Sequence, residues 1–255
     1  MLQKNSFYKK ELSKYKQETK EFSDSGKLNY CFREPDNIIP EKKYPLLLFL
    51  HGAGGRGSNN EEQLFDTGSI DAFSKQKIFL EFESFFFAPQ VPFDEQWVDV
   101  DWTTLNHKMP PISKTLEMTF KVLDEMISNK RDQIDTNRIY IMGVSMGGYG
   151  VWDALQRRPD FFAAGVPICG GGDTSKSSLI SNIPLWSWHG EKDDVISVQR
   201  SREMDDAIRE SGGKPKYTEI KNRDHGVWVD VWDSKKLWNW LYIQSFTSKG
   251  INYNE

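Results

Sequence analysis

The stretch Arg138-Ile139-Tyr140-Ile141-Met142-Gly143-Val144-Ser145-Met146-Gly147-Gly148 joins an apolar run to a turn of small residues. Its pattern G-x-S-x-G is typical of a strand that turns sharply into a helix with a serine at the bend. Side chains at Gly143 and Gly147 would crowd that turn, and the serine itself must tolerate a strained backbone. Because a serine hydroxyl is a weak nucleophile, Ser145 is a candidate nucleophile only if a base lies beside it. Taken alone, the motif is equally explained as a chance match.

From Tyr44 onward, apolar runs alternate with helical stretches. The runs cover residues 46–50, 85–88, 139–144, 164–169, 185–188 and 217–220, and helices are predicted over residues 112–127, 198–210 and 231–246. This alternation predicts an α/β fold with a mostly parallel sheet and helices on both faces. Residues 15–22 and 28–32 flank a Ser-Asp-Ser-Gly turn, which predicts an antiparallel hairpin at the sheet edge.

A glycine-rich loop follows the first of these runs, where Tyr44 to Leu50 leads into His51-Gly52-Ala53-Gly54-Gly55-Arg56-Gly57. Acyl transfer passes through a tetrahedral oxyanion that backbone N–H groups stabilise. The predicted donors are the N–H of Met146, directly after the serine, and that of Ala53 or Gly54. A phosphate-binding loop is the alternative, but the segment lacks the lysine and Ser/Thr of a P-loop and does not match G-x-G-x-x-G.

The base must be one of four histidines. His51 and His189 each end an apolar run and precede glycine, which suggests that they shape loops at strand ends. His107 lies in a loop before the serine and is more easily explained as a surface residue. His225 follows the predicted strand at 217–220 and satisfies the chain order Ser, Asp, His, so it is the predicted base.

The acid should orient His225 from the end of another strand. The strand Leu185-Trp186-Ser187-Trp188-His189 leads into a loop with Asp193 and Asp194, of which only one can point inward. We favour Asp193. Asp173, which ends a Cys-Gly-Gly-Gly turn, is a rival, and for each of them a solvated loop carboxylate is the ordinary alternative.

With these residues in view, the chain resembles a bacterial α/β-hydrolase group often labelled predicted peptidases, phospholipase/carboxylesterase-like proteins, or feruloyl and acetylxylan esterases. The resemblance spans most of the chain and rests on these segments: PLLLFLHGAGGRGSNNEEQL, FFFAPQVP with the following Trp97, NRIYIMGVSMGGYGVWDALQRRPDFFAAGVPICGGGD, IPLWSWHGEKDDVISVQRSREMDDAI and DHGVW. It implies an α/β-hydrolase fold with Ser145 as nucleophile, Asp193 as acid and His225 as base. Two positions depart from the group's pattern: Asp224 replaces a frequent glycine and Ser197 a common proline.

The expected function is therefore a serine carboxylic-ester hydrolase that acts through an acyl-enzyme on small acyl or aryl esters. The resemblance to carbohydrate esterases favours feruloyl or acetyl esters of plant polysaccharides. A serine peptidase with the same three residues is the nearest alternative, and a non-catalytic binding module on a hydrolase scaffold is another.

Aromatic residues near the predicted site suggest how a substrate is held. The longest irregular connection, residues 91–111, leaves the same rim of the sheet as Ser145 and carries Trp97. Trp97 is predicted to line an acyl or aryl pocket, or equally to pack inward and anchor the loop. Trp228, three residues past His225, carries the same two interpretations.

Composition excludes several other functions. The 255 residues are 38% hydrophobic and carry a net charge of -4, which suits one domain over residues 1–255 and gives no electrostatic footprint for nucleic acid. No apolar stretch approaches the roughly 20 residues of a membrane span, and the N-terminus has no apolar signal core, so a cytoplasmic protein is expected. A leader removed before this sequence begins would instead make it secreted or periplasmic. No CxxC or HExxH spacing occurs, so neither a metal nor another cofactor is expected, and nothing indicates the oligomeric state.

Overall fold

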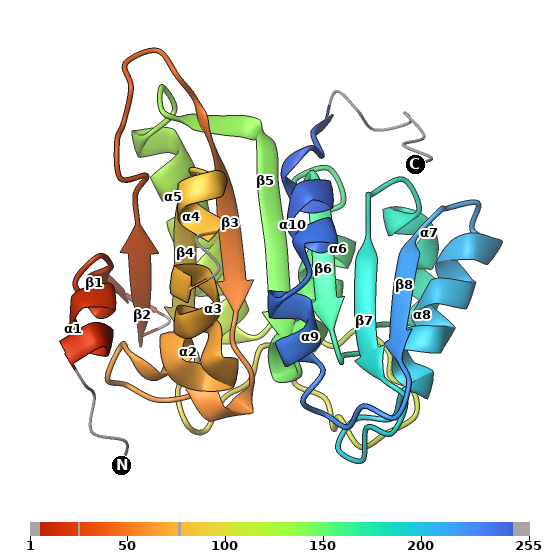
Figure 1. Cartoon of the computed structure of the whole chain (residues 1–255). Helices are drawn as coiled ribbons and strands as arrows, with labels where there is room; N and C mark the ends of the chain where they lie inside the picture. Colours follow the sequence, from red (N-terminus) through yellow and green to blue (C-terminus); the bar gives the residue numbers. More distant parts are fainter. Residues whose placement is uncertain (1–5, 25, 76–77, 247–255) are drawn as a thin grey trace.

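A computed structural model, which describes residues 6–24, 26–75 and 78–246, contains a single eight-stranded sheet with helices on both faces (Figure 1). The strand order is β1-β2-β4-β3-β5-β6-β7-β8. β1 pairs with β2, and β2 with β4, in the antiparallel direction, whereas the remaining neighbours are parallel. The predicted hairpin and the mostly parallel sheet are both confirmed.

The elements have the following bounds in the described residues. The strands are β1 Lys16–Phe22, β2 Gly26–Arg33, β3 Tyr44–Leu50, β4 Phe85–Gln90, β5 Ile134–Val144, β6 Ala164–Ile168, β7 Trp186–Gly190 and β8 Lys216–Ile220. The α-helices are α1 Ser6–Leu12, α2 Glu62–Phe65, α3 Ser69–Lys75, α4 Ile78–Glu81, α5 Lys114–Asn129, α6 Met146–Arg157, α7 Ser177–Ile180, α8 Gln199–Glu210, α9 Trp228–Trp232 and α10 Lys235–Tyr242. Three single turns of 3-10 helix are η1 Ala53–Gly55, η2 Asp66–Gly68 and η3 Thr174–Lys176.

The buried central strands divide their side chains between two cores because successive residues point to opposite faces. In β3, Leu46, Leu48 and Leu50 belong to the core that includes residues of α5, α6 and α8, whereas Leu47 and Phe49 belong to the core that includes residues of α3, α9 and α10. Figure 1 shows these two sets of helices on opposite faces of the sheet. Burial on both faces explains why the parallel strands read as continuous apolar runs.

The turn from β5 to α6 requires both glycines of the serine motif. A Cβ atom on Gly147 would collide with the backbone carbonyl of Leu50 at the end of β3. A Cβ atom on Gly143 would collide with the carbonyl of Gly147 itself and lie 2.9 Å from the Leu50 oxygen. The absence of side chains therefore lets β3, β5 and α6 approach one another at the bend.

The sequence-based prediction differs from the structure in two regions. The predicted helix at 231–246 is instead two helices, α9 and α10, broken at Asp233 and Ser234. The Ser234 side chain accepts from the Leu237 N–H and so starts α10 as a new N-cap. The short helices α1 to α4 were not predicted, because segments of about one or two turns give too few residues to show a helical period.

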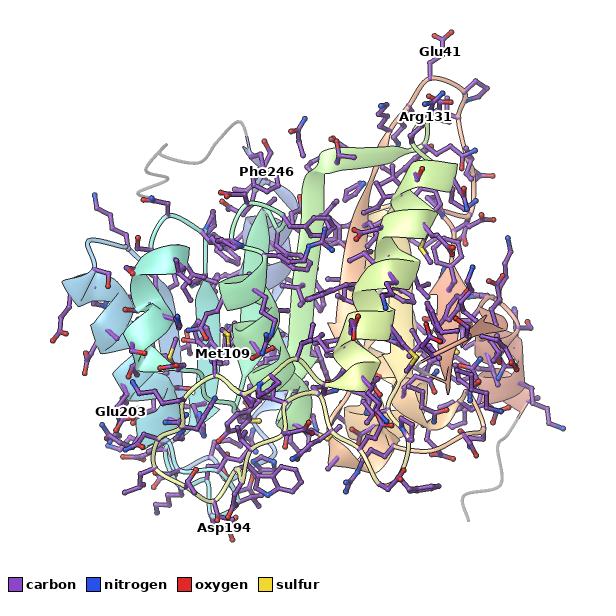
Figure 2. All side chains as sticks on the ribbon, turned by 180° about the vertical axis from the view of Figure 1, so that it is seen from behind. Glu41, Met109, Arg131, Asp194, Glu203 and Phe246 are labelled. Atoms are coloured by element: carbon purple, nitrogen blue, oxygen red, sulfur yellow. The ribbon has the colours of Figure 1, made fainter. Side chains whose placement is uncertain are left out.

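All of the predicted site residues belong to one end of the molecule. The parallel strands end at the lower edge of the sheet in Figure 1, where the loops after β3, β5, β7 and β8 meet. Figure 2 shows Asp194 at this end, and Glu41 and Arg131 at the other. In the described segments, none of the helices combines the length and the apolar character needed to traverse a bilayer.

Candidate active site

Ser145, His225 and Asp193 form one chain of hydrogen bonds. Oδ2 of Asp193 lies 2.7 Å from Nδ1 of His225, and Nε2 of His225 lies 3.0 Å from Oγ of Ser145. Because a carboxylate only accepts, Nδ1 carries the proton and donates to Asp193, which leaves Nε2 free to accept from the serine hydroxyl. The loops after β5, β7 and β8 thus bring together three residues that are far apart in the sequence.

Ser145 has the strained backbone that its motif requires. Its φ of 56° and ψ of -117° lie in a region that residues with a side chain rarely adopt. It precedes the first residue of α6, and its N–H donates to the Ile168 carbonyl at 2.8 Å. The strained backbone conformation of Ser145 is therefore stabilised by its hydrogen bond to the sheet and by the start of α6.

Asp193 is held as an anion by three hydrogen bonds and by a nearby imidazole N–H group. Its Oδ1 accepts from the N–H groups of Val195 at 2.9 Å and Ile196 at 2.8 Å. Its Oδ2 accepts from His225 and lies 3.1 Å from Nε2 of His189. Burial of the side chain would raise the pKa of Asp193, but its interactions with His189, His225 and the Ile196 N–H outweigh this effect and hold the pKa well below the usual range.

Backbone hydrogen bonds join the Asp193 loop to the His225 loop. The Glu191 N–H donates to the Ile220 carbonyl at 3.1 Å, and the Lys192 N–H donates to the Arg223 carbonyl at 2.8 Å. These bonds continue the pairing of β7 with β8 beyond the ends of both strands. The distance between the acid and the imidazole is thereby set by the sheet register.

The other two acids proposed as alternatives lie elsewhere. The Asp194 side chain is exposed to solvent. Asp173 is buried and caps η3, where it accepts from the Ser175 N–H at 3.0 Å and from the Met109 N–H at 2.9 Å. Asp224 is exposed beside His225, and its Oδ1 accepts from the Gly226 N–H.

The glycine-rich loop after β3 faces the same cavity as Ser145. Ala53 to Gly55 form η1, in which the Gly55 N–H donates to the Gly52 carbonyl at 3.1 Å. The N–H groups of Ala53 and Gly54 start this turn, and that of Met146 starts α6, so none of the three has a partner within its own helix. The three predicted donors therefore have N–H groups that helical geometry leaves available near Ser145.

His51 fixes this loop to the segment after β4. It is fully buried, its Nε2 accepts from the Val91 N–H at 3.0 Å, and its Nδ1 donates to the Gly52 carbonyl at 2.6 Å. Burial lowers the pKa of His51 from about 6.5 to about 4. His51 is accordingly a neutral structural residue near pH 7, as its position at a strand end suggested.

The cavity at Ser145 has a volume of about 260 Å³. The residues that line it are Gly52, Ala53, Gly54, Asp66, Thr67, Trp102, Ser145, Met146, Val195, His225 and Trp228. Trp228 packs edge-on against the His225 ring at 5.4 Å between centroids. Trp228 thus both lines the cavity and contacts the candidate base.

The structure places Trp97 away from this cavity. Its side chain is fully buried and donates from Nε1 to the His51 carbonyl at 2.9 Å, so the loop-anchoring alternative describes its contacts. Trp102, from the same long loop, lines the cavity instead, and the Tyr149 hydroxyl donates to its carbonyl at 3.2 Å. No periodicity distinguishes two tryptophans of one irregular loop, so their contacts decide between them.

Asp66 is a pocket residue that the sequence analysis did not identify. Its carboxylate lies against Gly52 and Gly54, close enough that a Cβ atom on either glycine would collide with it. Burial raises the pKa of Asp66 above its ordinary value.

One group of side chains in the described part of the chain has the spacing of a metal site. Ligand atoms of Cys169, Asp193 and His225 lie within 4.8 Å of one another. Two of these residues are already hydrogen bonded to each other, and burial raises the pKa of the Cys169 thiol well above 9. A thiol that retains its proton is a poor ligand, so we assign no metal to this group.

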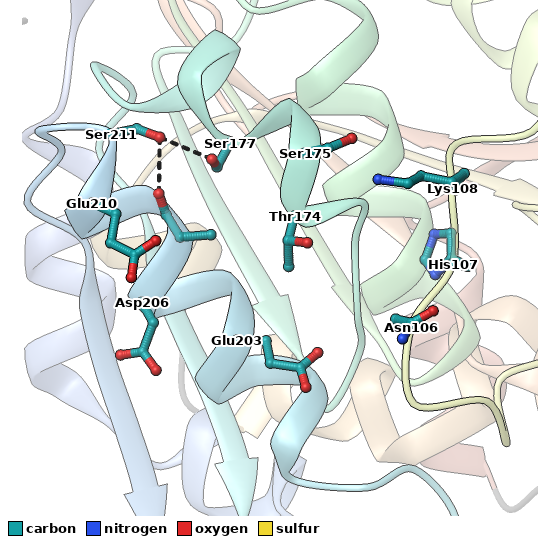
Figure 3. A pocket seen from close by; sticks show the side chains of 11 residues that line it. Asn106, His107, Lys108, Thr174, Ser175, Ser177, Glu203, Asp206, Glu210 and Ser211 are labelled. Carbon is teal, nitrogen blue, oxygen red and sulfur yellow. Dashed lines mark hydrogen bonds between the residues drawn. The ribbon is translucent and has the colours of Figure 1, made fainter.

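A cleft of about 700 Å³, larger than the cavity at Ser145, lies elsewhere on the described surface (Figure 3). It lies between the loop at residues 106–108, the segment from η3 to α7, and α8. Its walls are mostly polar, and the hydroxyls of Ser177 and Ser211 lie 2.9 Å apart in them. His107 lies here with its Nδ1 2.7 Å from the Arg200 guanidinium, away from the Ser145 site.

Comparison with known proteins supports the fold and the esterase resemblance. Residues 113–189 match the prolyl oligopeptidase family. The crystal structure of a thermostable esterase is similar, with 35% identity, a TM-score of 0.84, and coverage of 92% of this chain and 64% of that one. A ferulic acid esterase structure has 17% identity and a TM-score of 0.65 over 89% of this chain and 98% of that one, which bears on the fold alone.

A further relative is the bifunctional acetylxylan esterase/xylanase XynS20E of Neocallimastix patriciarum. It is 31% identical over 88 residues, which make up 34% of this chain. This chain spans only 13% of that protein and 64% of the thermostable esterase. The chain has the α/β-hydrolase fold, and its resemblance to the esterase-like group is confirmed.

The neutral state of buried His51 predicts a pH dependence of stability. Between pH 6.5 and 4 the unfolded chain binds a proton that the folded chain resists, so the free energy of unfolding should fall as the pH falls through this window. At 1.36 kcal/mol per pKa unit, the loss is about 3 kcal/mol at most. Denaturant unfolding of the parent and of His51→Gln at several pH values measures it. The free energy of unfolding of the variant should change less with pH than that of the parent. If the two proteins lose the same free energy of unfolding between pH 6.5 and 4, the prediction is contradicted.

Proposed function

We propose that this α/β-hydrolase is a serine esterase in which Ser145 is the nucleophile, His225 the general base and Asp193 the acid that orients it. The observation that carries the proposal is the hydrogen-bond chain from Asp193 through His225 to Oγ of Ser145. Such a chain activates a serine because the imidazole removes its proton as the bond to carbon forms.

The reaction would proceed in two steps. Oγ of Ser145 attacks the ester carbonyl while its proton passes to Nε2 of His225, and the tetrahedral intermediate then expels the alcohol, which takes that proton. Water next gives a proton to His225 and attacks the acyl-enzyme, releasing the carboxylic acid and restoring the serine. The N–H groups of Met146 and of Ala53 or Gly54 would hold the oxyanion in both steps.

The dimensions of the cavity favour a small acyl or aryl group. Its volume of about 260 Å³ lies just below the range of about 300–1,000 Å³ usual for drug-sized ligands. Trp102 and Trp228 provide aromatic faces on its walls. These features suit acetyl or feruloyl esters, and the similarity to an acetylxylan esterase/xylanase supports a carbohydrate ester as the substrate.

A peptidase with the same three residues is the second candidate, because residues 113–189 match the prolyl oligopeptidase family. Amide hydrolysis requires protonation of a leaving amine, which His225 could also supply. A panel of acetyl, feruloyl and longer acyl esters measured beside chromogenic peptides distinguishes the two, reported as ratios of kcat/KM.

Ser145→Ala should reduce kcat on p-nitrophenyl acetate or methyl ferulate by about 10⁶, because the nucleophile is lost. The parent should also be labelled by a fluorophosphonate at Ser145. Ser175→Ala, which alters an exposed serine of the separate cleft in Figure 3, is the matched control and should retain activity and labelling. An unlabelled parent would favour the non-catalytic binding module.

Asp193→Asn should lower kcat by about 10⁴, because the asparagine amide favours the wrong tautomer of His225. Asp194→Asn is the matched control, since its neighbouring carboxylate is exposed and should tolerate the change. Steady-state kinetics of the two variants on one ester provides the measurement. A larger loss in Asp194→Asn or in Asp173→Asn would show that the acid is assigned to the wrong residue.

Trp228→Ala should lower kcat/KM for feruloyl esters about tenfold more than for acetyl esters, because an aromatic contact contributes roughly 0.5–1.5 kcal/mol beyond its buried area. Trp186→Ala is a suitable control because Trp186 is also half-buried but starts β7, at the opposite end of the strand from the site. The ratio of kcat/KM values for the two esters is the measurement. An equal loss on both esters would remove Trp228 from substrate selection.

A further inference from the structure

His189 is a fully buried histidine whose contacts go beyond shaping a loop. It lies in β7, and its Nε2 is 2.9 Å from the Ile196 carbonyl and 3.1 Å from Oδ2 of Asp193. Both neighbours can only accept, so Nε2 carries a proton, which it donates to the Ile196 carbonyl, and Oδ2 of Asp193 lies close to the same N–H group. The carboxylate oxygen that accepts from His225 therefore also lies 3.1 Å from the N–H group of a second imidazole.

The other nitrogen of the His189 ring is fixed as well. Nδ1 lies 2.7 Å from Oγ of Ser201 in α8, and that oxygen lies 3.2 Å from the Gly170 carbonyl after β6. Ser201 is buried too. The ring is thus held by groups from α8, from the Asp193 loop and from the segment that follows β6.

We propose that His189 is a positioning residue that fixes the Oδ2 atom of Asp193 in the direction from which it accepts the Nδ1–H of His225. This inference rests on the proposed function, because it assigns His189 a role in the same reaction. Two backbone N–H groups donate to Oδ1, and the His189 N–H group lies 3.1 Å from Oδ2, so the surroundings of both oxygens oppose rotation of the carboxylate away from His225.

The same contact moderates the charge that His225 experiences. A donor on Oδ2 draws part of the negative charge of Asp193 toward His189. If that donor is removed, the carboxylate stabilises the His225 imidazolium more strongly, and His225 gains a proton at higher pH. The acid limb of the kcat/KM profile reports this change, since only the neutral imidazole can act as the base.

Other titratable or charged groups of the described residues lie around Asp193, His189 and His225. They are Cys169, Tyr149, Asp66, Glu219, Arg202 and Asp224. Burial raises the pKa of the Cys169 thiol and of the Tyr149 phenol, which keeps both uncharged. Glu219 is paired with Arg202 at 2.6 Å, and Asp224 is exposed to solvent. None of these groups replaces the donor that His189 supplies to Asp193.

The test compares His189→Leu, His189→Gln and Ser201→Ala with the parent. Leucine removes the donor, whereas a glutamine amide can place an N–H near the position of Nε2. The alanine removes the hydroxyl that fixes Nδ1. His107→Gln is the matched control, because His107 contacts Arg200 at the separate cleft. For each folded protein, kcat/KM on p-nitrophenyl acetate is measured between about pH 4.5 and 9, with product read at a wavelength that does not depend on pH.

His189→Leu should move the acid limb upward by about half to one pH unit and lower kcat/KM by about ten- to a hundredfold. His189→Gln should restore most of both quantities, and Ser201→Ala should shift the limb in the same direction. The low-field proton resonance of His225 Nδ1–H should weaken in the leucine variant. The control should match the parent.

Acid limbs of His189→Leu and Ser201→Ala that superimpose on that of the parent would overturn the inference. If the leucine variant does not fold, Ser201→Ala alone decides, by the same criterion. A parent that hydrolyses no ester and resists a fluorophosphonate would instead overturn the proposed function. An active, labelled parent with unshifted variants leaves that function standing and removes only the role of His189.

Discussion

The close approach of β3, β5 and α6 at Gly143 and Gly147 is the constraint on which the rest of the site depends. Because neither residue carries a Cβ atom, the elbow rests directly on the backbone at the end of β3. The loop that follows β3 then begins beside Ser145, and Ala53 and Gly54 line the same cavity as the serine. A single steric requirement therefore positions both the candidate nucleophile and the candidate oxyanion donors.

Much of this arrangement could be predicted because it depends on strand ends. Parallel strands direct their carboxyl ends to one rim, so a serine, an aspartate and a histidine that each follow a strand must lie near one another. The choice among Asp193, Asp194 and Asp173 required more than this rule. It depends on which carboxylate faces the loop after β8, and the loop with Asp193 is held there by backbone hydrogen bonds to Ile220 and Arg223.

The features that could not be predicted are contacts between irregular segments. Trp97 and Trp102 belong to one loop without periodicity, and the burial of Trp97 and its bond to the His51 carbonyl show that it is the one that packs inward. Asp66 lies in a short 3-10 turn whose position depends on the packing of α2 and α3. The break between α9 and α10 likewise follows from a local choice, since the Ser234 side chain satisfies the Leu237 N–H.

The strain at the site is supported by hydrogen bonds that extend the parallel ladder past the strand ends. Ser145 and Cys169 both have positive φ, and conformations of this kind cost about 1–3 kcal/mol each. The Ser145 N–H donates to the Ile168 carbonyl and the Cys169 N–H to the Trp188 carbonyl, both at 2.8 Å. Each strained residue is thus bonded to the neighbouring strand, and the Glu191 N–H makes the corresponding bond to β8. Because the central sheet is rigid, these hydrogen bonds stabilise the positive φ angles of Ser145 and Cys169, which an isolated loop would not maintain.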